Sequence, residues 1–154
     1  MKNLEKGINI FINIVFYVSL IALVFWAFGV RYYNVLSASM EPTIPVGSLI
    51  VVWPTSFDNV KDGDVVTAQL NTGILLTHRA VEVDHDQRHI ITKGDNNATR
   101  DAQPIRADQV VGTVAFHIPM LGGAIDFIKS TAGITLIASV IIAWVVLKRF
   151  VLNK

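Results

Sequence analysis

The sequence predicts a mainly β fold, in which a small β domain is anchored by an N-terminal and a C-terminal transmembrane helix. Two observations predict it. The chain has 154 residues, of which 52% are hydrophobic and only 16% charged, against a usual charged share of about 25%. Its apolar residues form long uncharged runs near both ends and short β-branched runs between them. This length corresponds to one domain.

The first element is the uncharged run of 23 residues from Ile8 to Val30. A bilayer core of about 30 Å needs about 20 helical residues, so the run predicts a transmembrane helix. A cleaved export signal has a shorter apolar stretch that ends in small residues, whereas Phe25, Trp26 and Phe28 stand near the end of this run. We therefore interpret residues 1–7 as a cytoplasmic tail and residues 8–30 as an uncleaved signal anchor.

The second apolar run covers 18 residues, 130–147, and predicts another transmembrane helix. Basic side chains flank both runs on their outer ends: Lys2, Lys6, Lys148, Arg149 and Lys154. Because basic residues stay on the cytoplasmic side, both termini are expected there, with residues 148–154 as a basic tail. Residues 31–129 are then extracytoplasmic.

The middle of the chain has the pattern of short strands. Its apolar, β-branched runs are residues 47–53, 64–70, 73–83, 89–92 and 109–118. Each is bounded by Gly, Pro, Asn or Asp, which favour turns, and no helical period is sustained through residues 35–118. The sequence leaves open whether four apolar residues of this region contact lipid or fill the β core: Met40, Ile44, Leu49 and Val51.

Composition excludes several kinds of chemistry. The chain has no cysteine, so disulfides, thiolate metal sites and a cysteine nucleophile are ruled out. The net charge of +1 offers no basic excess for nucleic acid. Asp84, His85, Asp86 and His89 could suggest a metal site, but the segment has the pattern of a polar turn between strands. We expect no metal, no cofactor and no nucleic-acid partner.

Three segments supply the groups of a serine nucleophile system. Ser37 and Ser39 stand in a segment whose backbone is restrained by Pro42. His78 lies in the longest strand pattern, and a neutral imidazole suits general-base work near neutral pH. The polar loop 93–101 carries two aspartates, and a histidine base needs a carboxylate to hold its tautomer. Spacing alone does not show that these groups meet in space.

The same three segments resemble the boxes of type I signal peptidases. The resemblance is to the small histidine-containing branch found in the endoplasmic reticulum, in archaea and in some Gram-positive bacteria. The serine box is matched by Ser39-Met40-Glu41-Pro42-Thr43, and the base box by His78-Arg79-Ala80-Val81. The aspartate box is matched by Lys93 to Asp101. Order and spacing agree from about residue 35 to residue 118, which covers the predicted outer domain.

The resemblance implies a membrane-bound serine endopeptidase with a signal-peptidase-like β domain. Ser39 would be the nucleophile and His78 the general base. The family pattern favours Asp101 as the carboxylate of the triad, with Asp95 as the second candidate. The backbone N–H of Ser39 and the hydroxyl of Ser37 are the expected oxyanion donors.

Substrate and location also follow from the resemblance. The partners would be secretory preproteins, bound as an added strand and cut after small residues, and the lipid bilayer. We expect a multi-pass protein of the plasma membrane, or of the endoplasmic reticulum if the host is eukaryotic, with the catalytic domain outside. The sequence does not say whether accessory membrane subunits are required.

Two other functions fit parts of the sequence. Self-cleaving repressor-type proteases are related, but they use a lysine base and are soluble. The two apolar runs of this sequence argue against that class. A non-enzymatic, membrane-anchored β module that binds a partner protein would make the three boxes coincidental. Replacing Ser39 by alanine separates the classes, because a binding module would keep its function.

Overall fold

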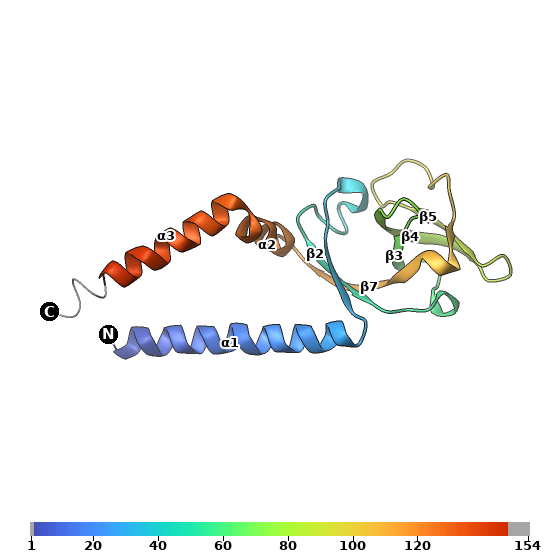
Figure 1. Cartoon of the computed structure of the whole chain (residues 1–154). Helices are drawn as coiled ribbons and strands as arrows, with labels where there is room; N and C mark the ends of the chain where they lie inside the picture. The colour runs from blue at the N-terminus through green and yellow to red at the C-terminus, as the bar shows by residue number, and fades with distance from the viewer. Residues whose placement is uncertain (1, 148–154) are drawn as a thin grey trace.

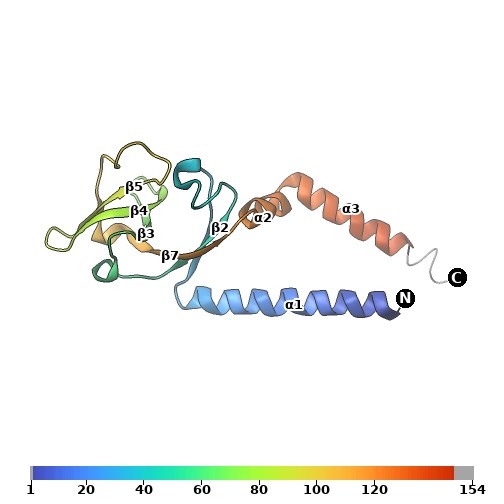
Figure 2. The same cartoon turned by 180° about the vertical axis from the view of Figure 1, so that it is seen from behind.

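A β domain stands at one end of the molecule, and two long helices extend away from it on the same side (Figures 1 and 2). The computed structural model describes residues 2–147. The first of these helices, α1 (Lys2–Ala27), begins at the end of the molecule farthest from the sheet, and the last, α3 (Thr131–Leu147), ends there. This arrangement places the start of α1 and the end of α3 on the same side of the β domain.

The helix α1 carries the N-terminal apolar run. Its segment Lys6–Ala27 has 22 residues and is, within residues 2–147, the single helix that is by itself long and apolar enough to cross a membrane. The helix ends at Ala27, three residues before the predicted end of the apolar run at Val30. Gly29 adopts a φ of +91° and turns the chain, and Val30 is only 1% exposed because it packs into the β domain.

The β domain is one antiparallel sheet of seven strands. The strands are β1 (Arg31–Asn34), β2 (Leu49–Trp53), β3 (Val65–Gln69), β4 (Leu75–Asp84), β5 (His89–Lys93), β6 (Ile105–Arg106) and β7 (Val110–Ile118). Their order in the sheet is β1-β2-β7-β3-β4-β5-β6. The mainly β prediction is confirmed, and the five predicted runs coincide with β2, β3, β4, β5 and β7. His85 and Asp86 lie in the predicted turn between β4 and β5, while Asp84 ends β4 and His89 begins β5.

Irregular pairing bends this sheet. The register shifts between Val51 and Val52 on β2, between Thr67 and Ala68 on β3, and beyond Ala80 on β4. Such bulges increase local twist and curve a strand. The sheet therefore curls around its own apolar side chains.

Two apolar clusters fill the interior. One contains Phe57, Val60, Val66, Ala68, Ala80, Ile90 and Ile105, and the other contains Met40, Ile44, Ile50 and Val52. Met40 and Ile44 are each 2% exposed, so the structure decides the open question about these side chains in favour of the core. Val51 is buried as well, and Leu49 is half-buried. The loop between β1 and β2 is thus held in place by its own buried residues, Met40 and Ile44.

The C-terminal part differs from the prediction. After β7 the chain forms α2 (Leu121–Lys129), a helix that the sequence analysis did not anticipate, and then α3. The segments Leu121–Lys129 and Thr131–Ser139 meet at 76° and pass the length and hydropathy criteria for a span only as a pair. Ser130 breaks the helix because its backbone is extended, with ψ at 157°. The predicted basic tail, residues 148–154, lies outside the described residues.

Candidate active site

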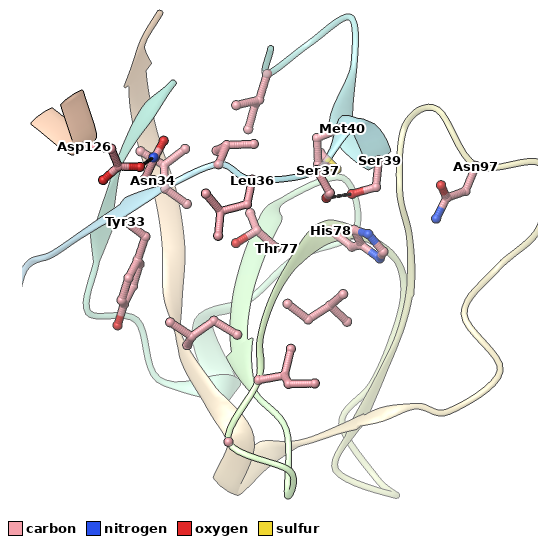
Figure 3. Close-up of a pocket in the computed structure, with 17 residues that line it drawn as sticks. Tyr33, Asn34, Leu36, Ser37, Ser39, Met40, Thr77, His78, Asn97 and Asp126 are labelled. Atoms are coloured by element: carbon pink, nitrogen blue, oxygen red, sulfur yellow. Dashed lines mark hydrogen bonds between the residues drawn. The ribbon is translucent and has the colours of Figure 1, made fainter. Parts of the chain in front are cut away.

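Ser39 lies in a short 3₁₀ turn, η1 (Ala38–Met40), between β1 and β2. The buried Met40 side chain anchors this turn in the core. Ser39 itself is half-buried, and its Oγ is 3.2 Å from the Oγ of the exposed Ser37. Both predicted serines therefore face the same space, with their hydroxyl groups within hydrogen-bonding distance (Figure 3).

His78 stands in the middle of β4, opposite Val66 of β3. Only 6% of its surface is exposed. Its Nδ1 atom is 2.6 Å from Oδ2 of Asp101. A carboxylate in this position holds the Nδ1–H tautomer and leaves Nε2 to accept a proton.

Asp101 is itself held by Thr92, which is buried on β5. The Thr92 hydroxyl donates to Oδ2 of Asp101 at 2.6 Å. The backbone N–H of Asp101 donates to the Thr92 carbonyl at 2.8 Å. These two bonds fix the carboxylate against the imidazole of His78. Thr92 was missed by the sequence analysis, although a threonine among the inward residues of an apolar strand is a detectable signal.

Asp95 has a different partner. The Arg79 guanidinium donates to both of its oxygens, from Nε to Oδ1 at 2.8 Å and from Nη2 to Oδ2 at 2.6 Å. These bonds lower the pKa of the Asp95 carboxyl, and they raise the pKa of Arg79 in turn. A third bond runs from Nη1 of Arg79 to the Gly63 carbonyl at 2.8 Å. Asp95 is therefore paired with Arg79, and the structure brings Asp101 to His78.

The loop that carries both aspartates, residues 93–101 (the aspartate loop), is hydrogen-bonded to the turn that carries Ser39, η1 (the serine turn). The Asn96 backbone N–H donates to the Ser39 carbonyl at 2.9 Å, and its side-chain amide donates to the Ala38 carbonyl at 3.2 Å. Gly94 allows this approach, because a Cβ built on it would lie 2.6 Å from the Ser39 carbonyl oxygen. The loop that carries both aspartates thus positions the backbone of Ser39.

An open cleft of about 760 Å³ runs along these groups. Segments 33–37 and 73–78 line it, together with Ser39, Met40, Ile44, Ile50, Asn97 and Asp126. Figure 3 shows Ser39 and His78 at one end and Asn34 with Asp126 at the other. The cleft is long and largely apolar, with a serine and a histidine–carboxylate pair at one end.

Ser39 and His78 line one cleft, and His78 is hydrogen-bonded to a carboxylate; these are the groups that the serine hydrolases use. Comparison with known proteins narrows this class. The family described as "Signal peptidase, peptidase S26" matches residues 8–135. The chain therefore belongs to the signal peptidase family S26, and the resemblance inferred from the three boxes is confirmed.

Individual relatives agree with this assignment. Signal peptidase I W of Bacillus subtilis is 40% identical, with 54% of this chain and 45% of that protein covered. The signal peptidase complex catalytic subunit SEC11 of Debaryomyces hansenii is 34% identical, covering 57% of this chain and 59% of the relative. SEC11 of Lachancea thermotolerans is 37% identical, with 57% and 60% covered. The chain thus spans about half the length of the curated relatives it matches.

Proposed function

We propose that this chain is a membrane-bound serine endopeptidase that removes signal peptides from exported preproteins. Ser39 is the nucleophile, His78 the general base and Asp101 the orienting carboxylate. The observation that carries the proposal is the contact between His78 Nδ1 and Asp101 Oδ2 at 2.6 Å, because His78 lines the same cleft as Ser39. Family membership and the three boxes support the same assignment.

The chemistry follows from this arrangement. Ser39 Oγ attacks the carbonyl carbon of the scissile peptide while Nε2 of His78 takes the hydroxyl proton. The imidazolium, stabilised by Asp101, returns the proton to the leaving amine as the C–N bond breaks. Water then attacks the acyl-enzyme with His78 as base again, which releases the signal peptide's new carboxylate and restores the serine.

The oxyanion of each tetrahedral intermediate needs preorganised donors. We assign this role to the backbone N–H of Ser39 and the hydroxyl of Ser37. The Ser37 hydroxyl is 3.2 Å from Ser39 Oγ and is therefore on the side of the cleft where the carbonyl must arrive. Losing one such donor costs about 10²- to 10³-fold in kcat in other enzymes.

The cleft suits an extended peptide. It runs between segment 33–37, which continues β1, and segment 73–77, which begins β4. A peptide laid between two extended segments can hydrogen-bond to both as an added strand. Apolar side chains such as Ile44 and Ile50 line the wall below it and leave room for small residues near the scissile bond.

We further propose that α1 spans the bilayer and that α3 provides a second span. The apolar side chains of α1 are exposed along its length, as lipid contact requires. Both helices leave the β domain on the same side (Figure 1). The protein is then a plasma membrane or endoplasmic reticulum membrane protein whose cleft lies on the extracytoplasmic side. An emerging signal peptide can reach Ser39 on that side.

Cleavage of a reporter preprotein by membranes that contain the full chain tests the proposal. Ser39→Ala and His78→Ala should each lower turnover by roughly 10³-fold or more, because triad members act as a unit. Ser56→Ala, at an exposed serine of the same domain, is the matched control and should cleave normally. If the Ser39→Ala chain cleaves at the wild-type rate, the nucleophile assignment is wrong and the cleft is a binding surface.

A further inference from the structure

The helix α2 lies across the direction of α3, at 76°. A helix that crosses a bilayer runs roughly along the membrane normal. If α3 crosses the bilayer, as proposed above, α2 therefore lies nearly parallel to the membrane plane. In both views α2 lies on the side of the β domain from which α1 and α3 extend (Figures 1 and 2).

One face of α2 is docked on the β domain. Gly122 packs so closely that an added Cβ would lie 2.8 Å from the Ser48 carbonyl oxygen and closer still to the Asn34 side chain. The Gly123 N–H donates to the Gly47 carbonyl at 3.0 Å. The Asn34 amide also donates to the carboxylate of Asp126. This face is thus made of two glycines and an aspartate.

The opposite face of α2 is apolar and uncovered. At about 100° per residue, Leu121, Ala124 and Ile128 lie opposite the docked face, and Phe127 and Ile125 lie at its two flanks. Phe127 and Ile128 are each 52% exposed, and Met120, just before the helix, is 81% exposed. Lys129 stands at the end of the helix, where a cation suits both the helix dipole and anionic headgroups.

We infer that α2 is an interfacial helix that rests in the outer headgroup region of the bilayer. The lipid-facing surface consists of Met120, Leu121, Ala124, Phe127 and Ile128. Lipid is the partner that covers this surface, because α2 continues directly into α3 and lies nearly at a right angle to it. The inference rests on the membrane anchoring proposed above and is independent of the catalytic proposal.

This placement would set the height of the cleft above the membrane. Asn34 and Asp126, which join β1 to α2, both line the cleft at the end away from Ser39 and His78 (Figure 3). A helix held at the lipid surface therefore fixes that end of the cleft at the same surface. A signal peptide would enter directly from the bilayer.

The absence of native cysteine makes a depth measurement clean. Single cysteines would be introduced as Ile128→Cys in α2, Val15→Cys in the middle of α1 and Gln87→Cys in the exposed β4–β5 turn. Each full-length variant would be reconstituted in phosphatidylcholine–phosphatidylglycerol vesicles at high lipid-to-protein ratio. The readouts are the rate of labelling by a membrane-impermeant maleimide and the quenching of an attached fluorophore by lipids with nitroxide at the headgroup or deep in the chain.

We expect Ile128→Cys to react roughly tenfold or more slowly than Gln87→Cys, because the reactive thiolate and the water-soluble reagent are both disfavoured where the side chain contacts lipid. Its fluorophore should be quenched more by the shallow nitroxide than by the deep one, whereas Val15→Cys should show the reverse. Labelling of Ile128→Cys as fast as that of Gln87→Cys would overturn the inference. Slow labelling without quenching by either lipid nitroxide would also overturn it, because protein would then cover α2.

Two further outcomes would also overturn it and are distinguishable. Deep quenching at position 128 would show that α2 crosses the bilayer together with α3. Absence of deep quenching at position 15 would refute the anchoring itself. Neither readout depends on turnover, so a failure of the proposed peptidase activity would leave both results interpretable.

Discussion

Replacing Gly94 by alanine tests whether the aspartate loop positions the nucleophile. The new Cβ would lie 2.6 Å from the Ser39 carbonyl oxygen and 2.8 Å from the Asn97 side-chain amide nitrogen. An ordinary contact begins at 3.4 Å, so the loop and the serine turn must separate by several tenths of an ångström. The buried Met40 side chain anchors the same turn in the core. We therefore expect the displacement to move the backbone of Ser39.

The size of the effect can be worked from this clash. Overpacking by one methyl group costs about 1–3 kcal/mol of stability. The separation also lengthens the bond from the Asn96 N–H to the Ser39 carbonyl, now 2.9 Å. A misplacement of about 1 Å at a reacting group costs roughly 10²-fold in rate. We expect kcat/KM for Gly94→Ala to fall between about ten- and a hundredfold.

The assay is reporter cleavage by the detergent-solubilised full chain, with thermal unfolding measured on the same sample. Gly123→Ala is the control, because its added Cβ would meet nothing nearer than the Gly47 carbonyl oxygen at 4.0 Å. The control should keep its activity and should melt no lower than the wild type, because alanine is the better helix former. Asn96→Ala, which removes only the side-chain bond to Ala38, should lie between the two variants.

Wild-type kcat/KM together with wild-type stability in Gly94→Ala would refute the positioning role of the loop. The turn would then be positioned without the loop. A melting temperature that falls while the kcat/KM of the folded fraction stays normal would contradict the positioning role specifically, because the clash would then be relieved away from Ser39.

Three other predictions concern the carboxylates. Asp101→Asn should lower kcat about 10⁴-fold, since an amide favours the wrong imidazole tautomer of His78; a loss under tenfold would remove Asp101 from the mechanism. Thr92→Val removes a donor to Asp101 and should lower kcat/KM about ten- to hundredfold, with recovery in Thr92→Ser; equal activity of the two variants would assign Thr92 to packing alone. The pKa of Asp95 is lowered by Arg79 in the folded state, so the pair stabilises the fold above the unfolded carboxyl pKa of about 3.9 and loses that contribution as pH falls. Asp95→Asn should therefore be less stable by about 1.5–3 kcal/mol at pH 7 in denaturant unfolding, with the gap closing below about pH 4; a gap that persists in acid would refute the assignment.

Much of the fold was predictable because it depends on local patterns. The uncharged run of α1 and the β-branched runs of β2, β3, β4, β5 and β7 are set by hydrophobicity and turn residues. The helix α2 was not predicted, because two adjacent glycines, Gly122 and Gly123, are poor helix formers. They are stabilised here by docking on the β domain, which is a tertiary effect.

The sequence by itself determined a helix that is long and apolar enough to cross a membrane, the β class, and the three segments that carry a serine, a histidine and two aspartates. The tertiary structure alone decided which aspartate meets the histidine. His78 and Arg79 are neighbours on β4 and point to opposite faces of the strand. Each therefore takes a different carboxylate of the same loop, Asp101 and Asp95 respectively. Spacing along the chain limits how far apart two groups can lie, but the strand register and the loop's contacts determine which of them touch.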